Sequence, residues 1–105
     1  DWSSDVCSSD LRLSELAPAL GGEIFRVGQR VAAALYASDL RCEGVNFFLA
    51  DGEAAMQDVF HVHLHVIPRY EGDGFGLKLP EGYYDGAERS ALDLVAADLR
   101  HNLKA

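Results

Sequence analysis

Apolar positions recur at helical spacing over the first third of the chain. Steps of three or four residues separate Leu16, Leu20, Ile24, Val27, Val31 and Leu35, which places them on one face of an α-helix. Ser14 is suited to cap the start of this helix, and Pro18 is tolerated near its first turn. Because Gly21 and Gly22 lie inside it, we expect the helix to bend there or to be approached closely by another element. We expect it to end near Ser38.

Two shorter segments have the composition of β-strands. Residues 44–49 include valine and two phenylalanines, which favour a strand. Residues 59–67 alternate histidines with apolar side chains and are predicted to form a second strand, which Pro68 is expected to stop. A glycine-rich loop over residues 71–86 then leads into a second amphipathic helix over residues 87–103. Its apolar side consists of Leu92, Val95, Leu99 and Leu103.

Two strands and two helices are few for a stable domain. We therefore expect further strands to belong to the intact domain, and this chain to be poorly stable because a strand edge would be exposed.

Length and charge narrow the class of protein. The chain has 105 residues, enough for one domain, and a formal net charge of −8. That charge disfavours a general nucleic-acid binder, although local donors can still hold a small anion.

No apolar run reaches the roughly 20 residues that cross a bilayer, and the first ten residues lack the pattern of a secretory signal. We expect a cytoplasmic protein with no membrane partner. Cys7 and Cys42 lack metal or redox spacing and are predicted to be unpaired.

Residues 1–10 differ in character from the rest of the chain. They combine serines and aspartates around Trp2, show no periodicity and do not begin with Met. The string resembles one reading frame of a common sequencing-library adapter. We therefore interpret residues 1–10 as a non-native segment and residues 11–105 as the part that carries the domain. The alternative is a disordered native N-terminus, and in neither case do we expect function there.

Three of the four histidines alternate within residues 60–67, Phe-His-Val-His-Leu-His-Val-Ile. Because successive side chains of a strand point to opposite faces, His61, His63 and His65 are predicted to share one face. The apolar residues between them would form the opposite, core-facing side. A single strand histidine is usually an ordinary polar residue, but each of three in a row needs a hydrogen-bonding partner or water. This pattern therefore favours a functional site.

Two kinds of chemistry suit such a row. Imidazoles two residues apart on a strand can bind zinc, but at about 3.3 Å per residue His61 and His65 would be roughly 13 Å apart, too far to share one ion. The fourth histidine, His101, stands alone on the terminal helix. A neutral imidazole can instead attack phosphorus near pH 7, while its neighbours donate hydrogen bonds to the oxygens. The row therefore favours phosphate chemistry over a metal site.

The segment from His61 to Ile67 resembles the pattern of the histidine-triad (HIT) family at every position. Residues 51–60, with Gln57 four positions before the first histidine, resemble the family's glycine-containing loop. Residues 67–75 resemble the segment that follows the triad in bacterial members, and similarity of some kind extends from about residue 13 to the end. The resemblance implies an α+β fold with an antiparallel sheet, a long helix and a C-terminal helix. Residues 11–105 would be the C-terminal part of one HIT domain whose N-terminal strands are missing, and the intact protein would be a homodimer.

The resemblance also implies a mechanism that needs no cofactor. In the family, the middle histidine attacks the α-phosphorus of a nucleotide and forms a nucleotidyl-histidine, which water or another acceptor then resolves. His63 would be this nucleophile, His65 would contact the non-bridging oxygens, and His61 would orient His63. Gln57 would lie on the loop that cradles the phosphate. The favoured substrates are dinucleoside polyphosphates, such as diadenosine polyphosphate.

Three departures from the family pattern put the substrate preference in doubt. Met56 stands where many members have glycine, Asp58 replaces a serine or threonine, and Ala50 stands where several branches have an amide side chain. Two alternatives stay open, the first because of these departures and the second because histidines two residues apart can bind zinc. One is a nucleotide-binding or regulatory module without catalysis, and the other is a zinc-binding protein that uses two of the triad histidines.

Five other residues are assigned no chemistry. Asn46 and Asp51 are expected in strand-end and turn roles, and Arg69 in solvent. Cys42 is expected to be a small buried residue. His101, near the end of its helix, is placed to complement the helix dipole.

Overall fold

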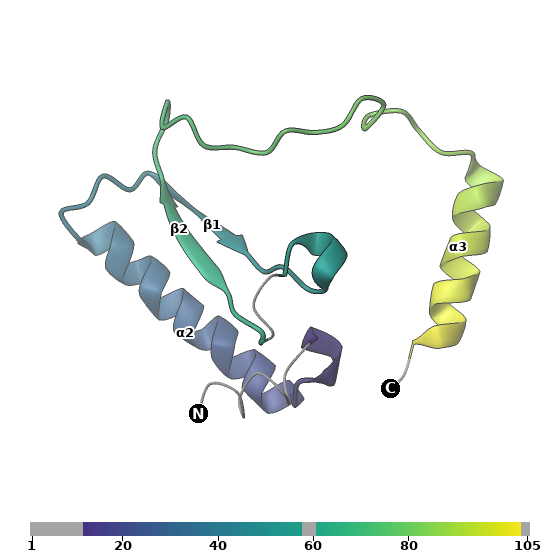
Figure 1. Cartoon of the computed structure of the whole chain (residues 1–105), viewed down its shortest axis with the longest axis horizontal. Coiled ribbons are helices and arrows are strands. Elements are labelled where there is room, and N and C mark those ends of the chain that lie inside the picture. Colours follow the sequence, from purple (N-terminus) through teal and green to yellow (C-terminus); the bar gives the residue numbers. More distant parts are fainter. Residues whose placement is uncertain (1–11, 58–60, 104–105) are drawn as a thin grey trace. The chain divides into compact units, whose positions relative to one another are not determined.

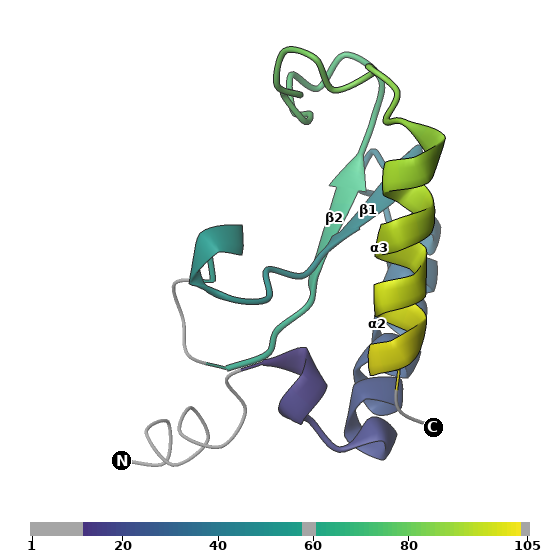
Figure 2. The ribbon, with the colours of Figure 1, turned by 90° about the vertical axis from the view of Figure 1, so that its right-hand side faces the viewer.

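The computed structural model describes residues 12–57 and 61–103 (Figures 1 and 2). In chain order it contains the 3-10 helix η1 (Leu13–Glu15), helix α2 (Pro18–Ala37), strand β1 (Gly44–Phe48), the 3-10 helix η2 (Glu53–Ala55), strand β2 (His65–Arg69) and helix α3 (Arg89–Asn102). The chain divides into two compact units, Asp1–Gly74 and Phe75–Ala105. Helices together with an antiparallel sheet confirm the α+β class.

Helix α2 begins later than the sequence suggested. Ser14 lies in η1 and does not cap the helix, so its assignment as the N-cap was wrong. Pro18 occupies the first helical turn, where its missing N–H costs nothing because that N–H would have no partner within the helix. The helix ends as predicted at Ser38, whose hydroxyl donates to the carbonyl oxygen of Leu35 at 2.8 Å. Proline at the start and serine at the end therefore set its length.

The close approach to α2 occurs at Gly28 and not at Gly21 or Gly22. A Cβ atom on Gly28 would lie 3.1 Å from Cδ2 of Leu64 and 3.6 Å from Cε1 of Phe47, whereas one on Gly22 would meet nothing within 4 Å. Helix α2 packs against β2, and the two elements lie next to each other in Figure 1. Its least exposed face runs through Gly28, so Val27 and Val31 lie at the edge of the predicted stripe and are more exposed.

Strands β1 and β2 form a two-stranded antiparallel sheet. Gly44 pairs with Arg69 at one end of the sheet, and Phe48 pairs with His65 at the other. The prediction that Pro68 stops the second strand was wrong, because Pro68 lies within β2 opposite Val45. Among the described residues β2 has one strand neighbour, and a proline is tolerated on such an edge strand because only one side needs to form ladder hydrogen bonds.

The second unit contains the predicted C-terminal helix and the predicted loop from residue 75 onward. Residues 71–86 include no helix or strand, as expected, and α3 covers Arg89–Asn102 within the predicted range. Arg100 and His101 lie in its last turn, which confirms the helix-end placement of His101. Among the described residues, no helix combines the length and the apolar character needed to cross a bilayer.

Candidate active site

The three histidines His61, His63 and His65 lie next to one another, and we refer to them as the triad. Only His65 belongs to a strand, as the first residue of β2, so the predicted strand over residues 59–67 was partly wrong. Residues 61–64 are outside any strand, and residues 58–60 lie outside the described residues. The ring centroids of His61 and His63 are 5.3 Å apart, and those of His63 and His65 are 4.8 Å apart. The prediction that the three rings lie together is therefore confirmed without a continuous strand.

Between the histidines, the apolar residues face helix α2. Leu64 approaches Gly28, and Val62 and Leu64 border a cavity of about 290 Å³. Ile24, Val27 and Val31 of α2 line the same cavity, and His63 contributes to its wall. His61 and His63 are half-buried like Val62 and Leu64, and His65 is exposed. Because His63 borders the same cavity as Val62 and Leu64, the predicted division into an apolar and an imidazole face is borne out only in part.

The ring of His63 is held by the backbone of its own segment. Its Nδ1 lies 3.1 Å from the carbonyl oxygen of His61, and because a carbonyl only accepts, Nδ1 carries the proton and donates. In a neutral imidazole the other nitrogen, Nε2, then keeps its lone pair. Among the described residues, no group forms a hydrogen bond with Nε2 of His63. This arrangement orients a nucleophilic nitrogen away from the backbone.

Gln57 is buried at the end of the loop that precedes the triad. Its side-chain oxygen accepts from the N–H of Gly52 at 2.7 Å, and its own N–H donates to the carbonyl of Gly52 at 3.1 Å. Its side-chain nitrogen donates to the carbonyl oxygen of His61 at 3.3 Å. Gln57 therefore closes the loop of residues 52–57 and connects it to the triad. Its predicted contact with substrate stays a prediction.

The three departures from the family pattern fall in different environments. Met56 has a φ of 70° and a ψ of 30°, the left-handed conformation that favours glycine, and its side chain is exposed. Ala50 is buried. Asp58 lies outside the described residues. The glycine expected at position 56 therefore has a backbone reason, which Met56 does not satisfy without strain.

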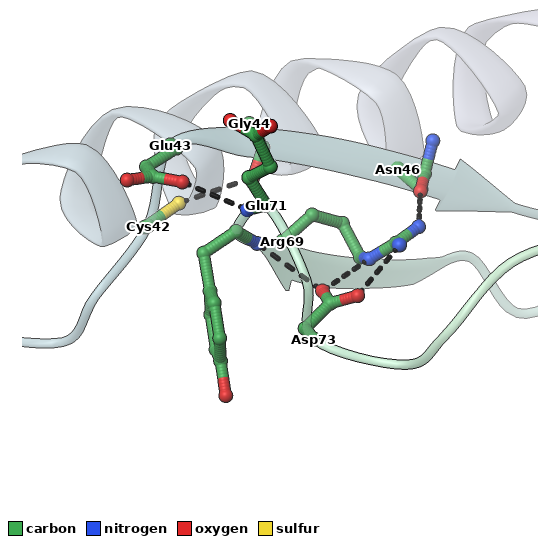
Figure 3. A network of polar contacts seen from close by, with 8 residues as sticks. Cys42, Glu43, Gly44, Asn46, Arg69, Glu71 and Asp73 are labelled. Atoms are coloured by element: carbon green, nitrogen blue, oxygen red, sulfur yellow. Dashed lines mark hydrogen bonds and ion pairs between the residues drawn. The ribbon is translucent and has the colours of Figure 1, made fainter.

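Arg69 is engaged by other side chains at the opposite end of the sheet (Figure 3), so the expectation that it lies in solvent was wrong. Its Nε and Nη2 donate to the two carboxylate oxygens of Asp73 at 2.7 and 2.8 Å, and its Nη1 donates to Asn46. The N–H of Glu71 donates to the carboxylate of Glu43 at 2.8 Å. We call these five residues the turn network. Hydrogen bonding to Asp73 raises the pKa of the Arg69 guanidinium and keeps it charged.

Three residues set aside from the chemistry have structural roles. Asn46 contacts Arg69 across the sheet, and Asp51 accepts from the N–H of Leu13 at 2.9 Å, which ties η1 to the loop before η2. Cys42 is half-buried, less buried than expected, and its Sγ lies 3.2 Å from the carbonyl oxygen of Gly44. The position of Asp51 agrees with its expected role, whereas Asn46 lies in the middle of β1 and not at a strand end.

The turn network and Gly28 were missed by sequence reasoning for the same reason. Arg69 and Asp73 are four residues apart in a turn, where opposite charges give no periodic signal, and Asn46 is far away in the sequence. Gly28 looked like one more helical glycine. In both cases the structural role of the residue depends on which segment of the chain packs beside it.

Within the described part of the chain, the triad has no further metal-ligating side chains beside it that would complete a metal site. Across residues 12–57 and 61–103, no three histidine, cysteine, aspartate or glutamate side chains come together in a way that could hold a metal ion. The described residues therefore do not fit a three-ligand metal centre.

Comparison with known proteins identifies the family. The profile of the family described as HIT domain matches residues 8–72. A HIT-like protein of Borreliella burgdorferi is 34% identical over 78 residues, which are 74% of this chain and 52% of that protein. Protein hit of Bacillus subtilis is 40% identical over 63 residues, 59% of this chain and 43% of that protein. The chain thus spans about half the length of the curated relatives it matches.

Solved structures give the same result. A HIT family protein from Bacillus anthracis superposes with a TM-score of 0.76 at 33% identity, covering 91% of this chain and 67% of that one. A zinc-bound histidine triad family protein from Mycobacterium smegmatis superposes with a TM-score of 0.61 at 32% identity, covering 90% and 67%. The family profile covers more than half of the chain and includes the triad, so this protein belongs to the HIT domain family.

Proposed function

We propose that this protein is a nucleotide hydrolase or nucleotidyl transferase that uses His63 as a nucleophile toward the α-phosphorus of a nucleotide conjugate. Dinucleoside polyphosphates are the favoured substrates, on the basis of the family resemblance. The observation that carries this proposal is the orientation of His63. Its Nδ1–H is bound to the His61 carbonyl, and its ring lies between the rings of His61 and His65.

The reaction consists of two displacements at phosphorus. First, the lone pair on Nε2 of His63 attacks the α-phosphorus, a P–N bond forms, and the P–O bond to the leaving phosphate chain breaks with its electron pair. The proton stays on Nδ1 of His63, and its hydrogen bond to the His61 carbonyl stabilises the ring as positive charge develops. Then water or another acceptor attacks phosphorus, the P–N bond breaks, and the electron pair returns to Nε2. The acceptor's proton is released, so the enzyme is regenerated.

The neighbouring histidines supply hydrogen bonds to the phosphate. His65 is exposed and its ring touches that of His63, so a donor nitrogen of His65 can reach a non-bridging oxygen of a phosphate bound at His63. Donors aimed at the oxygens where charge increases lower the barrier more than they strengthen substrate binding. His61 contributes through its carbonyl, which orients the nucleophile.

The test is turnover of diadenosine tetraphosphate by the protein and by two single variants. We expect His63→Ala to lower turnover by at least on the order of 10³-fold, because the reacting nitrogen is removed. The matched control is His101→Ala, which removes an imidazole from the last turn of α3 and is expected to leave turnover unchanged. Retained turnover in His63→Ala would contradict the mechanism.

Two alternative functions, a regulatory nucleotide-binding module and a zinc-binding protein, would give different experimental results. Nucleotide binding without turnover in the unaltered protein would favour a regulatory module. The departures from the family pattern at Met56 and Ala50 are the reason for considering this alternative. Zinc binding is suggested by the zinc-bound relative from Mycobacterium smegmatis. Stoichiometric zinc in protein purified without added metal would support it, and its absence would remove it.

We further propose that the active protein is a cytoplasmic homodimer, again from the family resemblance. The solution mass measured by light scattering tests the assembly, since a monomer mass at micromolar concentration would contradict it.

A further inference from the structure

The carbonyl oxygen of His61 is a junction between the loop and the nucleophile. It accepts one hydrogen bond from Nδ1–H of His63 at 3.1 Å and another from the side-chain nitrogen of Gln57 at 3.3 Å. A carbonyl oxygen has two lone pairs, so it can accept both bonds at once. The direction of this carbonyl therefore sets the tautomer and the orientation of the His63 ring.

Gln57 is well suited to hold that carbonyl in place. Its side chain is only 7% exposed, and its oxygen is fixed by the N–H of Gly52 at 2.7 Å. Its backbone N–H returns to the carbonyl of Gly52 at 3.1 Å, so both its side chain and its backbone are tied to the same residue. A buried amide held in this way loses little further freedom when it binds the next carbonyl.

We propose that Gln57 is a positioning residue, which keeps His63 in the Nδ1–H tautomer by orienting the carbonyl of His61. This role differs from the phosphate contact implied by the family resemblance, because both polar atoms of the Gln57 side chain contact backbone groups. Gln57 then acts on the nucleophile and not on the bound substrate.

A consequence for kinetics follows from this indirect role, which rests on the proposed function. For Gln57→Ala we expect kcat to fall on the order of 10- to 100-fold while KM changes little, since the loss misplaces the nucleophile. If Gln57 bound the phosphate directly, its substitution would instead raise KM.

The decisive measurement does not require turnover. Histidine tautomers are read from long-range ¹⁵N–¹H correlation spectra of the full chain at about pH 8, where imidazole side chains are generally neutral. We expect His63 to be Nδ1-protonated in the unaltered protein and to gain an Nε2-protonated fraction in Gln57→Ala. Gln57→Glu tests the two hydrogen bonds of this side chain separately. Its carboxylate can still accept from the N–H of Gly52, but it places an oxygen against the His61 carbonyl and cannot donate to it. It should shift the tautomer in the same direction.

The matched control is Asp51→Ala, which releases the other anchor of the loop, the bond from the N–H of Leu13, without touching the His61 carbonyl. We expect His63 to remain Nδ1-protonated in this variant. An unchanged tautomer in both Gln57 variants, an equal change in Asp51→Ala, or an Nε2-protonated His63 in the unaltered protein would each overturn the role of Gln57. The proposed function fails separately, if the unaltered protein shows the expected tautomer but no turnover.

Discussion

The two ends of the β1–β2 sheet both gather polar side chains, but they use them differently. At the end where Gly44 pairs with Arg69, charged groups face one another, and the guanidinium of Arg69 is occupied by Asp73 and Asn46 (Figure 3). At the end where Phe48 pairs with His65, the polar side chains Gln57 and His63 bind backbone groups instead.

The difference decides which end can carry chemistry. Side chains that satisfy one another in ion pairs have their donors and acceptors occupied, so they fix a turn. An imidazole anchored to the backbone through one nitrogen keeps its second nitrogen for a substrate. The turn network is therefore structural, and the triad end is the candidate for catalysis. Each of the following predictions tests this contrast.

Packing beneath the triad end is expected to be sensitive to volume. Gly28→Val would place side-chain atoms into Leu64 and Phe47, and we expect it to lower the free energy of unfolding by about 1–3 kcal/mol. The measurement is the urea midpoint. The matched control is Gly22→Ala, where a Cβ meets nothing within 4 Å and better helix propensity should raise stability by about 0.5–1 kcal/mol. Equal effects at both positions would show that α2 is not held closely against the sheet.

The loop before the triad is expected to be strained at one residue. Met56 has a φ of 70°, so Met56→Gly should raise the free energy of unfolding by about 1 kcal/mol. Ala55→Gly, in the neighbouring 3-10 helix, should instead lower it by roughly 0.5–1 kcal/mol. If both substitutions lowered the urea midpoint, the left-handed conformation at position 56 would be wrong.

The turn network is expected to contribute least to activity. Asp73→Asn removes the charge that pairs with Arg69, so the turn of residues 70–74 should open more often and the amide of Tyr70 should exchange faster. Turnover should change by less than about threefold, since this partly buried pair lies at the end of the sheet far from the triad. Asp93→Asn breaks the pair of Arg89 and Asp93 in α3, which has the same four-residue spacing but is more exposed, and serves as control. A tenfold loss of turnover in Asp73→Asn alone would mean that the two ends are coupled.

Local patterns in the sequence predicted the two helices and the grouping of the triad, but not where α2 and β2 begin. Helical spacing predicted α2 and α3, and the alternation of residues 61–65 predicted that the three imidazole rings lie close together. Those signals are carried by neighbouring residues, because helices and extended segments present side chains with fixed periods.

Contacts between distant segments could not be predicted in this way. The bond of Arg69 to Asn46 and the approach of Leu64 to Gly28 both depend on how the chain returns upon itself. Pro68 also misled the strand prediction, since a proline ends a central strand but is accepted at an edge.

The central claim is that His63 forms a covalent bond to the α-phosphorus. It is tested most directly by intact mass measurement after brief incubation with diadenosine tetraphosphate and alkaline quenching, because a phosphoramidate adduct is labile in acid and stable in base. We predict one adenylyl group on the unaltered protein and on His101→Ala, and none on His63→Ala. An adenylyl adduct that persists in His63→Ala would contradict the assignment of His63 as the nucleophile.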